Sequence, residues 1–482
     1  MILTPAPIAP NRRKQVAAAS TLLKGPRGTK TFDDFIFKYA DSTKEYRQIE
    51  AVHKPLRQAL RGHLLRQDIH IGAEILEPLL FRLIRDGSVD PVSEAVAELN
   101  QQAFHEPGFV LYPVHSYGVM RTFSLASPGP AGTGDLVFTD LGIAIAPPTQ
   151  SIKNTLAFVT RSAAALGITS PAPISEIRQE HANPRLHWLS KNPLLMIRVR
   201  SYSAGAYENQ SEFMRRLGLG AAFVMLLSVL VDPRDEKRWN SSRSSNETLD
   251  IRHYLVGDNG GGGRNLSHRR VPMNLSPAGL AQLSDLNVNL HLDRLAAPAG
   301  TRLARRAEQA IVALEAFTRL NAVIQQPATA RTRLSSKLLD SVYWFRRSFP
   351  AGSQDHEAIV SLAVAFESLL IDSYASGVTG RIVDRAIHIL KAEGQPAPVQ
   401  EIVRKLFSAR GDIVHAGSTS TTLNLPLARE AYAFCLLHLL GRIGHVSETT
   451  TTAVGDMLGE VALVRAGLGE RVRRAWRALM QG

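Results

Sequence analysis

Cysteine is almost absent from this chain of 482 residues, because Cys435 is the only one. One cysteine cannot form an internal disulfide, and without a CxxC pair no cysteine-based zinc site is expected. We expect Cys435 to be a buried structural thiol, since it lies in the apolar segment AYAFCLLHLL. The fold is therefore expected to be intracellular and to depend on packing instead of disulfides.

Long hydrophobic runs are also missing. The most apolar run, residues 217–231, is 15 residues long, short of the roughly 20 that a membrane helix needs. Two arginines precede it and Asp232-Pro233 follow it, so a buried core helix is expected. The basic residues 12–14 follow the apolar start of the chain instead of preceding it, unlike a secretion signal. We expect a soluble, cytoplasmic protein with no membrane partner.

Common catalytic motifs are absent as well. The 15 histidines mostly stand alone, and the chain has no HExxH, no GxSxG and no GxGxxG after a strand. The segment GDNGGGGRN at 257–265 is not a phosphate-binding loop, because no Gly-Lys-Ser/Thr follows it. Asp135 and Asp140 lie in a β-rich segment, yet nothing singles out a paired-carboxylate site. No cofactor and no metal are expected.

Basic residues, in contrast, are in excess, with 56 Lys and Arg against 43 Asp and Glu and a formal net charge of +13. This balance favours a polyanionic partner such as nucleic acid. Residues 1–30 hold six Lys or Arg and no acid, and predict a mobile basic tail, either a nucleic-acid arm or a solvated terminus. Residues 301–350 hold nine Lys or Arg against three acids, and 471–477 add four Arg.

The hydrophobic pattern divides the chain into two regions. Helical spacing over 31–102 is followed by short β-rich runs at 108–146 and 192–203. We therefore predict a mixed α/β region over 31–290, of unassigned sensing or regulatory role. The Ser, Asn and Gly density within 232–267 predicts a long exposed loop.

From residue 300 the pattern is helical almost throughout, with short breaks, and predicts a helical bundle over 300–445. A further basic helix is expected in 446–482, running from about 453 to 480 and ending in RVRRAWRALM. The fold class is therefore multidomain α+β, with an N-terminal mixed α/β region and a C-terminal all-α bundle.

One cluster, ARGDIVHAG at 409–417, carries chemistry. His415 can accept a proton from a ribose 2′-hydroxyl or give one to the leaving oxygen, and Arg410 can neutralise the charge that builds on the phosphate. This chemistry needs no metal and is specific for RNA. Asp412, three residues before His415, can orient it. In an ideal helix, five residues turn about 140° past a full turn, so convergence requires a loosened helix at Gly411 or a twofold-related copy.

Three stretches of the bundle resemble the HEPN superfamily, in particular its Apea-like branch. SVYWFRRS at 341–348 is similar to that branch's aromatic helix, and AIVSLAVAFESLL at 358–370 to its next helix, with Glu367 at the family acid. Arg385 falls where a family arginine follows, and ARGDIVHAG is similar to the family's signature of an arginine followed by a histidine. The resemblance covers about residues 300–445.

The resemblance implies a helical bundle, usually dimeric, and a metal-independent ribonuclease with Arg410 and His415 as its catalytic pair. Such domains occur in toxin–antitoxin and anti-phage abortive-infection systems, which implies an antitoxin or phage-derived trigger as a partner. Glu367 and Arg385 are then supporting residues, or instead members of buried ion pairs that fix the bundle. Gly411 and Ala416 differ from the residues common in the signature.

Three functions follow as hypotheses. The first is a ribonuclease effector whose N-terminal region senses a trigger or restrains activity. The second is a catalytically silent RNA-binding or dimerisation module. The third is a ligand or protein sensor whose bundle is only structural.

Overall fold

The computed structural model describes the following residues: 10–24, 31–39, 44–67, 69, 71–102, 106–113, 117–120, 135–147, 149, 151–169, 172–182, 189, 194–200, 207–231, 253–258, 266–272, 288–321, 329–349, 355–372, 377–417, 423–447 and 449–460. The chain forms two compact units. The N-terminal unit comprises 1–115, 124–220 and 242–284, and the C-terminal unit 116–123, 221–241 and 285–482. Three segments of the region predicted as 31–290, residues 116–123, 221–241 and 285–290, thus group with the C-terminal unit.

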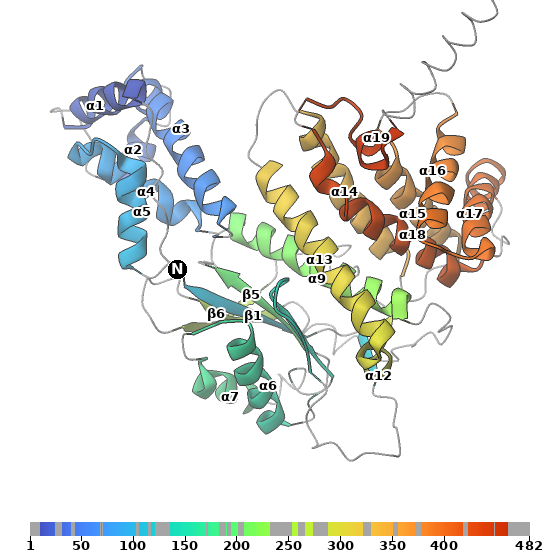
Figure 1. Ribbon diagram of the computed structural model, residues 1–482. Helices are drawn as coiled ribbons and strands as arrows, with labels where there is room; N and C mark the ends of the chain where they lie inside the picture. Colours follow the sequence, from blue (N-terminus) through green and yellow to red (C-terminus); the bar gives the residue numbers. More distant parts are fainter. Residues whose placement is uncertain are drawn as a thin grey trace, which may run out of the picture. The chain divides into compact units, whose positions relative to one another are not determined.

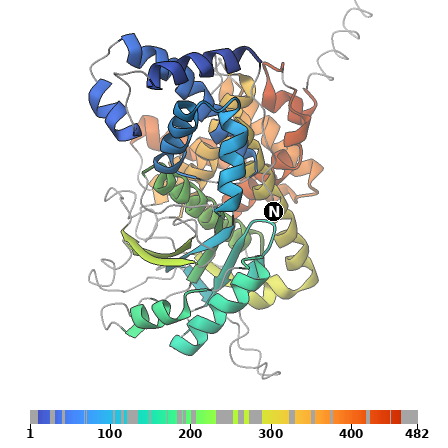
Figure 2. The same cartoon turned by 90° about the vertical axis from the view of Figure 1, so that its left-hand side faces the viewer.

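The N-terminal unit begins with a cluster of five helices, the blue elements of Figure 2: α1 (Pro10–Lys24), α2 (Phe32–Tyr39), α3 (Lys44–Arg66), α4 (Ala73–Asp86) and α5 (Pro91–Gln101). Their apolar faces share one core, in which Phe35, Leu60 and Leu80 are fully buried. The start of α5 is fixed by the Asp90 carboxylate, which accepts a hydrogen bond from the Ser93 amide at 3.1 Å. The helical pattern predicted over 31–102 is confirmed.

Helix α1 corrects the prediction of a mobile basic tail. Val16, Ala19 and Leu23 are buried, and their spacing forms one apolar stripe that packs in the core of this cluster. The Ser20 hydroxyl donates to the Arg85 carbonyl at 3.2 Å, which ties the helix to α4. The basic residues dominate the composition of this stretch and conceal its apolar stripe. Residues 1–9 and 25–30 lie outside the described residues.

The second part of the N-terminal unit is a sheet of six described strands. They are β1 (Pro107–Pro113), β3 (Leu136–Phe138), β4 (Ile143–Ala146), β5 (Leu194–Arg200), β6 (His253–Asp258) and β7 (Ser267–Pro272). The order is β3-β4-β5-β1-β6-β7, and all neighbours are antiparallel. Helices α6 (Ile152–Ala165) and α7 (Ile174–Ala182) lie on one face (Figure 1). The strands predicted at 108–146 and 192–203 are confirmed where these ranges are described, while 121–134, 192–193 and 201–203 lie outside the described residues.

The central strands are buried on both faces, which explains their continuous apolar sequences. Phe109 and Leu111 of β1 share a core with α6 and α7. Helix α9 (Tyr207–Val231) begins against the opposite face, because a Cβ at Gly220 would lie 3.1 Å from the side chain of Ile143. The core helix predicted at 217–231 is confirmed, since all but two of those residues are buried.

The loop predicted over 232–267 is corrected where β6 lies within it. Gly257 belongs to a strand because it pairs with Phe109, and a Cβ there would lie only 2.9 Å from the Phe109 ring. Glycine at this position admits the aromatic ring, which the sequence pattern alone does not reveal. Leu266 is also buried, while 232–252 and 259–265 lie outside the described residues.

The C-terminal unit contains the predicted bundle. Its described elements are the parallel strand pair β2 (Tyr117–Met120) and β8 (Val288–His291), the short helix α12 (Leu292–Ala296), and the helices α13 (Pro298–Asn321), α14 (Ala330–Arg347), α15 (Asp355–Leu370), α16 (Val378–Ala392), α17 (Ala397–Ala416), α18 (Leu425–Leu440) and α19 (Ala453–Leu458), with a 3-10 turn, η3 (Ile443–His445). The aromatic core is centred on Tyr432, whose ring stacks on Phe345 at 4.6 Å and meets Phe366 edge-on at 5.4 Å. Cys435 is fully buried, as predicted, and burial raises the pKa of its thiol.

The predicted basic helix over 453–480 is corrected at its first part. Helix α19 ends at Gly459, which has a φ of 72° in the left-handed region. The Asp372 carboxylate accepts hydrogen bonds from the amides of Val454 and Gly455, at 2.7 and 3.2 Å, and so fixes α19 to the end of α15. Residues 461–482, with the four arginines of 471–477, lie outside the described residues.

Among the helices that the structure describes, none combines the length and the hydropathy that crossing a membrane requires.

Candidate functional site

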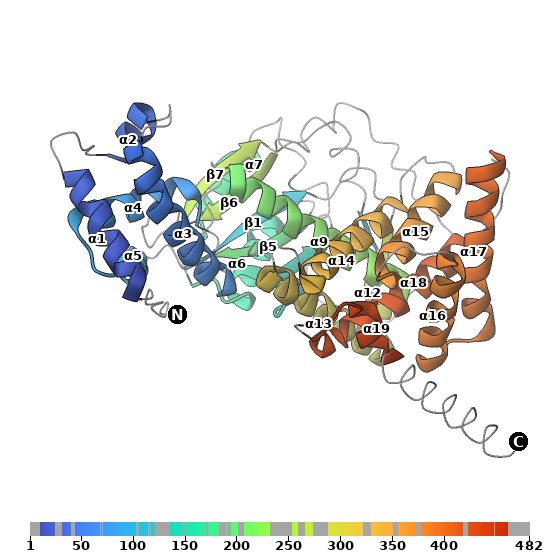
Figure 3. The same ribbon diagram turned by 90° about the horizontal axis from the view of Figure 1, so that it is seen from above.

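Helix α17 carries the sequence-predicted site on its exposed end. The helix begins after Pro396, and its buried residues Val399, Ile402, Val403 and Leu406 recur at helical spacing. From Arg410 to Ala416 no residue is buried, and Gly417, at a φ of 64°, ends the helix. In Figures 1 and 3, α17 lies at one side of the bundle. The site therefore belongs to a helix end that is open to a ligand or to another chain.

Gly411 does not loosen this helix, which corrects one of the two ways in which Arg410 and His415 were expected to meet. The α-helix is continuous through Gly411 to Ala416, because the hydrogen-bonded backbone tolerates a single glycine. Five residues in a regular helix turn about 140° past a full turn, so the two side chains leave the helix in different directions. Within one copy of the chain they do not converge.

Arg410 is held by Glu367, the acid predicted to support it. The Arg410 Nη2 atom lies 3.5 Å from Glu367 Oε1, and the two side chains are 30% and 13% exposed. Helices α15 and α17 pack side by side and bring the two residues together. Arg410 Nε is buried and has no hydrogen-bond partner among the described residues. The guanidinium is thus oriented by one carboxylate and keeps donors for a further group.

His415 and Asp412 are both exposed. Among the described residues neither side chain has a hydrogen bond or ion pair, so the expected orientation of His415 by Asp412 is not observed. Between them lies Val414, a large apolar side chain that is 51% exposed. The His415 side chain is therefore accessible to a further group.

Arg385 is not part of this group, although it was predicted to support the site. It is buried and donates to the Leu370 carbonyl, to Asp372 at 3.1 Å and to Glu460 at 2.6 and 2.7 Å. Burial alone would lower the pKa of Arg385, but the bonds to the two carboxylates outweigh burial and raise it. Of the two roles considered for Arg385, the structure places it in a buried ion pair that joins α15, α16 and α19.

A second cluster was missed by sequence reasoning. An open cavity of about 570 Å³ lies between α13, α18 and the end of α16, and is lined by Arg306, Glu393, His438 and Arg442. The Nδ1 atom of His438 lies 2.6 Å from Glu393 Oε1, and Arg306 binds both oxygens of the same carboxylate, at 2.6 and 2.8 Å. Glu393 is separated from Arg306 by 87 residues and from His438 by 45, so no local motif announces the cluster.

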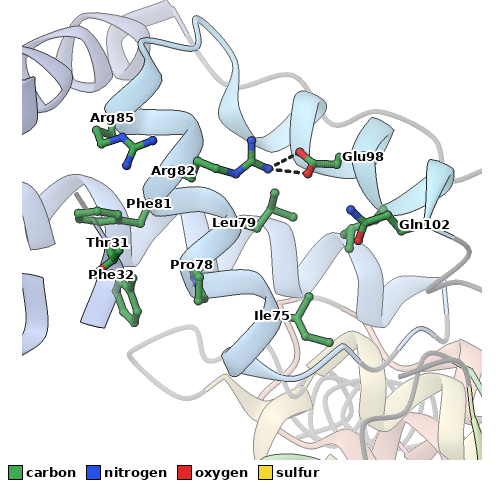
Figure 4. A pocket seen from close by; sticks show the side chains of 11 residues that line it. Thr31, Phe32, Ile75, Pro78, Leu79, Phe81, Arg82, Arg85, Glu98 and Gln102 are labelled. Carbon is green, nitrogen blue, oxygen red and sulfur yellow. Dashed lines mark hydrogen bonds and ion pairs between the residues drawn. The ribbon is translucent and has the colours of Figure 1, made fainter. Parts of the chain in front are cut away.

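A third feature is an apolar groove of about 430 Å³ in the N-terminal helical cluster (Figure 4). Phe32, Ile75 and Leu79 line it. On its rim, Arg82 binds Glu98 at 2.5 Å, and this hydrogen bond raises the pKa of Arg82. The groove therefore combines apolar surface with a rim on which Arg82 and Glu98 neutralise each other.

No protein-family model, no curated protein and no solved structure matches this chain. Within the residues that the structure describes, no group of three or more His, Cys, Asp or Glu side chains is gathered as a metal ion would need. Function is therefore inferred from the chain's own residues and their geometry.

Proposed function

We propose that the bundle, residues 300–445, is a metal-independent endoribonuclease of the HEPN type that acts as a homodimer in the cytoplasm. The protein would act as a toxin or as an anti-phage abortive-infection effector. Its region 31–290 would sense a trigger or restrain the activity. Support comes from the motif ARGDIVHAG on one exposed helix end and from the placement of Glu367 against Arg410.

One observation carries the proposal: Arg410 and His415 occupy the same exposed end of one continuous helix. The geometry of a regular helix directs their side chains about 140° apart. A second copy, related by a twofold axis across the ends of two α17 helices, can bring its His415 to the first copy's Arg410. The exposed Val414 supplies an apolar contact for such an axis. A composite site of this kind also gives His415 the orienting partner that it lacks in one copy.

In that site the two residues divide the work. His415 removes the proton from the ribose 2′-hydroxyl, and the resulting oxygen attacks the adjacent phosphorus and displaces the 5′-oxygen. Arg410, fixed by Glu367, neutralises the charge that develops on the phosphate oxygens. The nucleophile belongs to the substrate, so DNA is not cleaved.

RNA attraction is supported by the exposed side of α13 and α14. Arg302, Arg305 and Arg333 are exposed there. Trp344 is only half-buried, and the guanidinium of Arg347 lies 4.9 Å from its ring centroid. Cationic and aromatic groups in alternation are the surface that single-stranded RNA prefers.

The test is complementation between inactive variants of the full chain. Wild type is expected to cleave mixed RNA in EDTA, while Arg410→Ala and His415→Ala each lose at least about a hundredfold in rate. Mixing and re-equilibrating the two variants is expected to restore up to about a quarter of the activity, because half of the dimers are mixed and each holds one intact site. Restoration is the result that a site within one copy cannot give.

Arg404→Ala and His388→Ala are the matched controls, since both residues are exposed on α17 and α16 and neither belongs to the site. Both are expected to retain wild-type rates. Cleavage that survives in Arg410→Ala and in His415→Ala removes the pair from the mechanism.

The divergence of Arg410 and His415 also favours a second candidate, a catalytically silent RNA-binding or dimerisation module. In that case the wild-type chain binds RNA, and mixtures of intact protein and RNA show no cleavage at any protein concentration.

A further inference from the structure

The cavity between α13, α18 and the end of α16 holds a histidine that is fixed in position. The Glu393 carboxylate lies 2.6 Å from His438 Nδ1, and the two side chains are 12% and 9% exposed. Arg306 binds the same carboxylate from α13, so Glu393 can hardly rotate away. A carboxylate bonded to Nδ1 fixes the tautomer and the ring orientation of a histidine.

This arrangement leaves the other ring nitrogen for a ligand. Nε2 of His438 makes no hydrogen bond within the part of the chain that the structure describes, and His438 lines the cavity. In the neutral imidazole whose Nδ1 proton faces Glu393, Nε2 is a hydrogen-bond acceptor. A hydroxyl group of a ligand can donate a hydrogen bond to His438 Nε2.

The charges around the cavity call for one anionic group. Arg306 and Glu393 compensate each other. Burial acts to raise the pKa of Glu393, but its bonds to Arg306 and His438 outweigh burial and lower it, so the carboxylate is ionised at neutral pH. Arg442, on the same cavity, donates one bond to the Met457 carbonyl at 3.3 Å and has no acidic partner among the described residues. The wall thus carries a net charge of one positive unit.

Apart from Gln309, the rest of the lining carries no polar side chain and accommodates an organic body. Ala310 and Ala313 keep one wall shallow, and Leu437, Leu440 and Ile443 form the other. The volume of about 570 Å³ lies in the range of roughly 300–1,000 Å³ that is typical of small-molecule sites.

We infer that this cavity binds a small organic anion that carries a hydroxyl group, with the anionic group on Arg442, the hydroxyl on His438 Nε2, and the apolar body against α13 and α18. The anionic group is a carboxylate or a phosphate. The inference does not depend on the ribonuclease proposal, because it uses none of the residues of α17.

The test is calorimetric titration of the full chain with 4-hydroxybenzoate and with AMP, which separate a carboxylate from a phosphate source. Inorganic phosphate alone tests whether the organic body is needed. The neutral 4-hydroxybenzamide and adenosine remove the anionic group from each probe, and benzoate removes the hydroxyl. Saturable binding of an anionic, hydroxyl-bearing probe, weakened at least about tenfold in its matched neutral compound, is expected.

Two variants connect binding to the cavity. Arg442→Gln removes the uncompensated charge, and His438→Asn keeps a donor for Glu393 while removing Nε2; each is expected to weaken the probe at least about tenfold. Arg404→Gln, an exposed arginine on α17, is the control and is expected to bind as wild type does. The thermal midpoint of Arg442→Gln without ligand checks that the fold is intact.

Two results overturn the inference. One is that neither 4-hydroxybenzoate nor AMP binds saturably to the wild-type chain at millimolar concentration. The other is binding that Arg442→Gln leaves unchanged. Loss of RNA cleavage has no bearing on either result.

Discussion

Buried polar side chains of the bundle act as a set of specific pairs. The Ser341 hydroxyl donates to the Ala365 carbonyl at 2.7 Å, and its oxygen lies 2.6 Å from the Tyr432 hydroxyl. Because the Ser341 hydroxyl already donates its one proton to the Ala365 carbonyl, the Tyr432 hydroxyl is the donor in its bond to Ser341. Such pairs orient the residues around them, since a buried polar group left without a partner is costly.

Tyr432→Phe is expected to lower the free energy of unfolding by about 1 kcal/mol, because it removes one buried hydrogen bond while Ser341 keeps its bond to Ala365. Urea unfolding measures the change. Tyr343→Phe, at a residue that is 37% exposed, is the control and should change stability by less than about 0.5 kcal/mol. Equal losses in both variants would contradict the assigned bond.

Glu393 predicts an acid-sensitive contribution to stability. Its pKa is lowered in the fold, so its contribution is present above the unfolded value of about 4.3 and is lost as pH falls through the lower folded value. Glu393→Gln should therefore lower the free energy of unfolding by about 1–2 kcal/mol at pH 7. The loss is limited because Arg306 is half-exposed, so solvent screens part of its ion pair with Glu393. Chemical denaturation from pH 7 to 3 measures the difference in free energy of unfolding between wild type and the variant. This difference should become smaller below about pH 4.3.

At the scale of whole elements, the ends and joints of helices decide where the chain turns. Gly417 ends α17 in a left-handed conformation, whereas Gly411, inside the same helix, has helical geometry. Arg385 and Asp372 join α15, α16 and α19 from the inside. Residues of the same type therefore have different structural roles, since one glycine ends α17 and the other lies within it.

The two glycines of α17 predict opposite effects of one substitution. Gly411→Ala should stabilise by about 0.5–1 kcal/mol, because an added Cβ meets no atom within 4 Å and alanine favours helix. Gly417→Ala should destabilise by about 1–2 kcal/mol, because its φ of 64° strains a residue with a Cβ. Thermal unfolding compares the pair, and the same sign in both would show that α17 is not continuous through Gly411.

Arg385→Met is expected to destabilise the bundle by about 3 kcal/mol, because it leaves the buried Asp372 without its cation. Arg404→Met removes an exposed pair with Glu401 and should cost less than about 0.5 kcal/mol. Denaturant midpoints distinguish the two. A small effect of Arg385→Met would mean that the ion pairs of Arg385 with Asp372 and Glu460 do not hold α15, α16 and α19 together.

At the scale of the whole molecule, the net charge of +13 produces a long-range electrostatic potential and does not by itself form a binding site. The basic surplus of residues 301–350 falls on α13 and α14, and exposed arginines lie on both helices. Part of the N-terminal basic stretch is instead a helix with its apolar stripe buried. The charge therefore supports long-range attraction of a polyanion without choosing its identity.

If RNA is that polyanion, its affinity for the full chain should fall by at least about tenfold between 50 and 200 mM salt, because each phosphate that is neutralised releases counterions. Fluorescence anisotropy with a single-stranded RNA measures the slope. An affinity that does not change with salt would separate the net charge from RNA binding.

Much of the element pattern was predictable, because it depends on local periodicity. Helical spacing predicted the bundle and the core helix at 217–231, and apolar runs with turns predicted the strands from Gly108 onward. The burial of Cys435 followed from its apolar neighbours. The site motif ARGDIVHAG and the choice of Glu367 as a supporting residue came from sequence resemblance, and the structure places Glu367 beside Arg410 of that motif.

The sequence by itself therefore determined most of the helices and strands, apart from α1 and β6, since these depend on the periodicity of neighbouring residues. It also indicated the motif at 409–417 as a candidate site. Only the tertiary structure decided which distant residues meet. It packs the basic α1 in a core, seats the Phe109 ring on Gly257, and gathers Arg306, Glu393 and His438 around one cavity. It also turns Arg410 and His415 apart, because a continuous helix fixes their directions regardless of the motif.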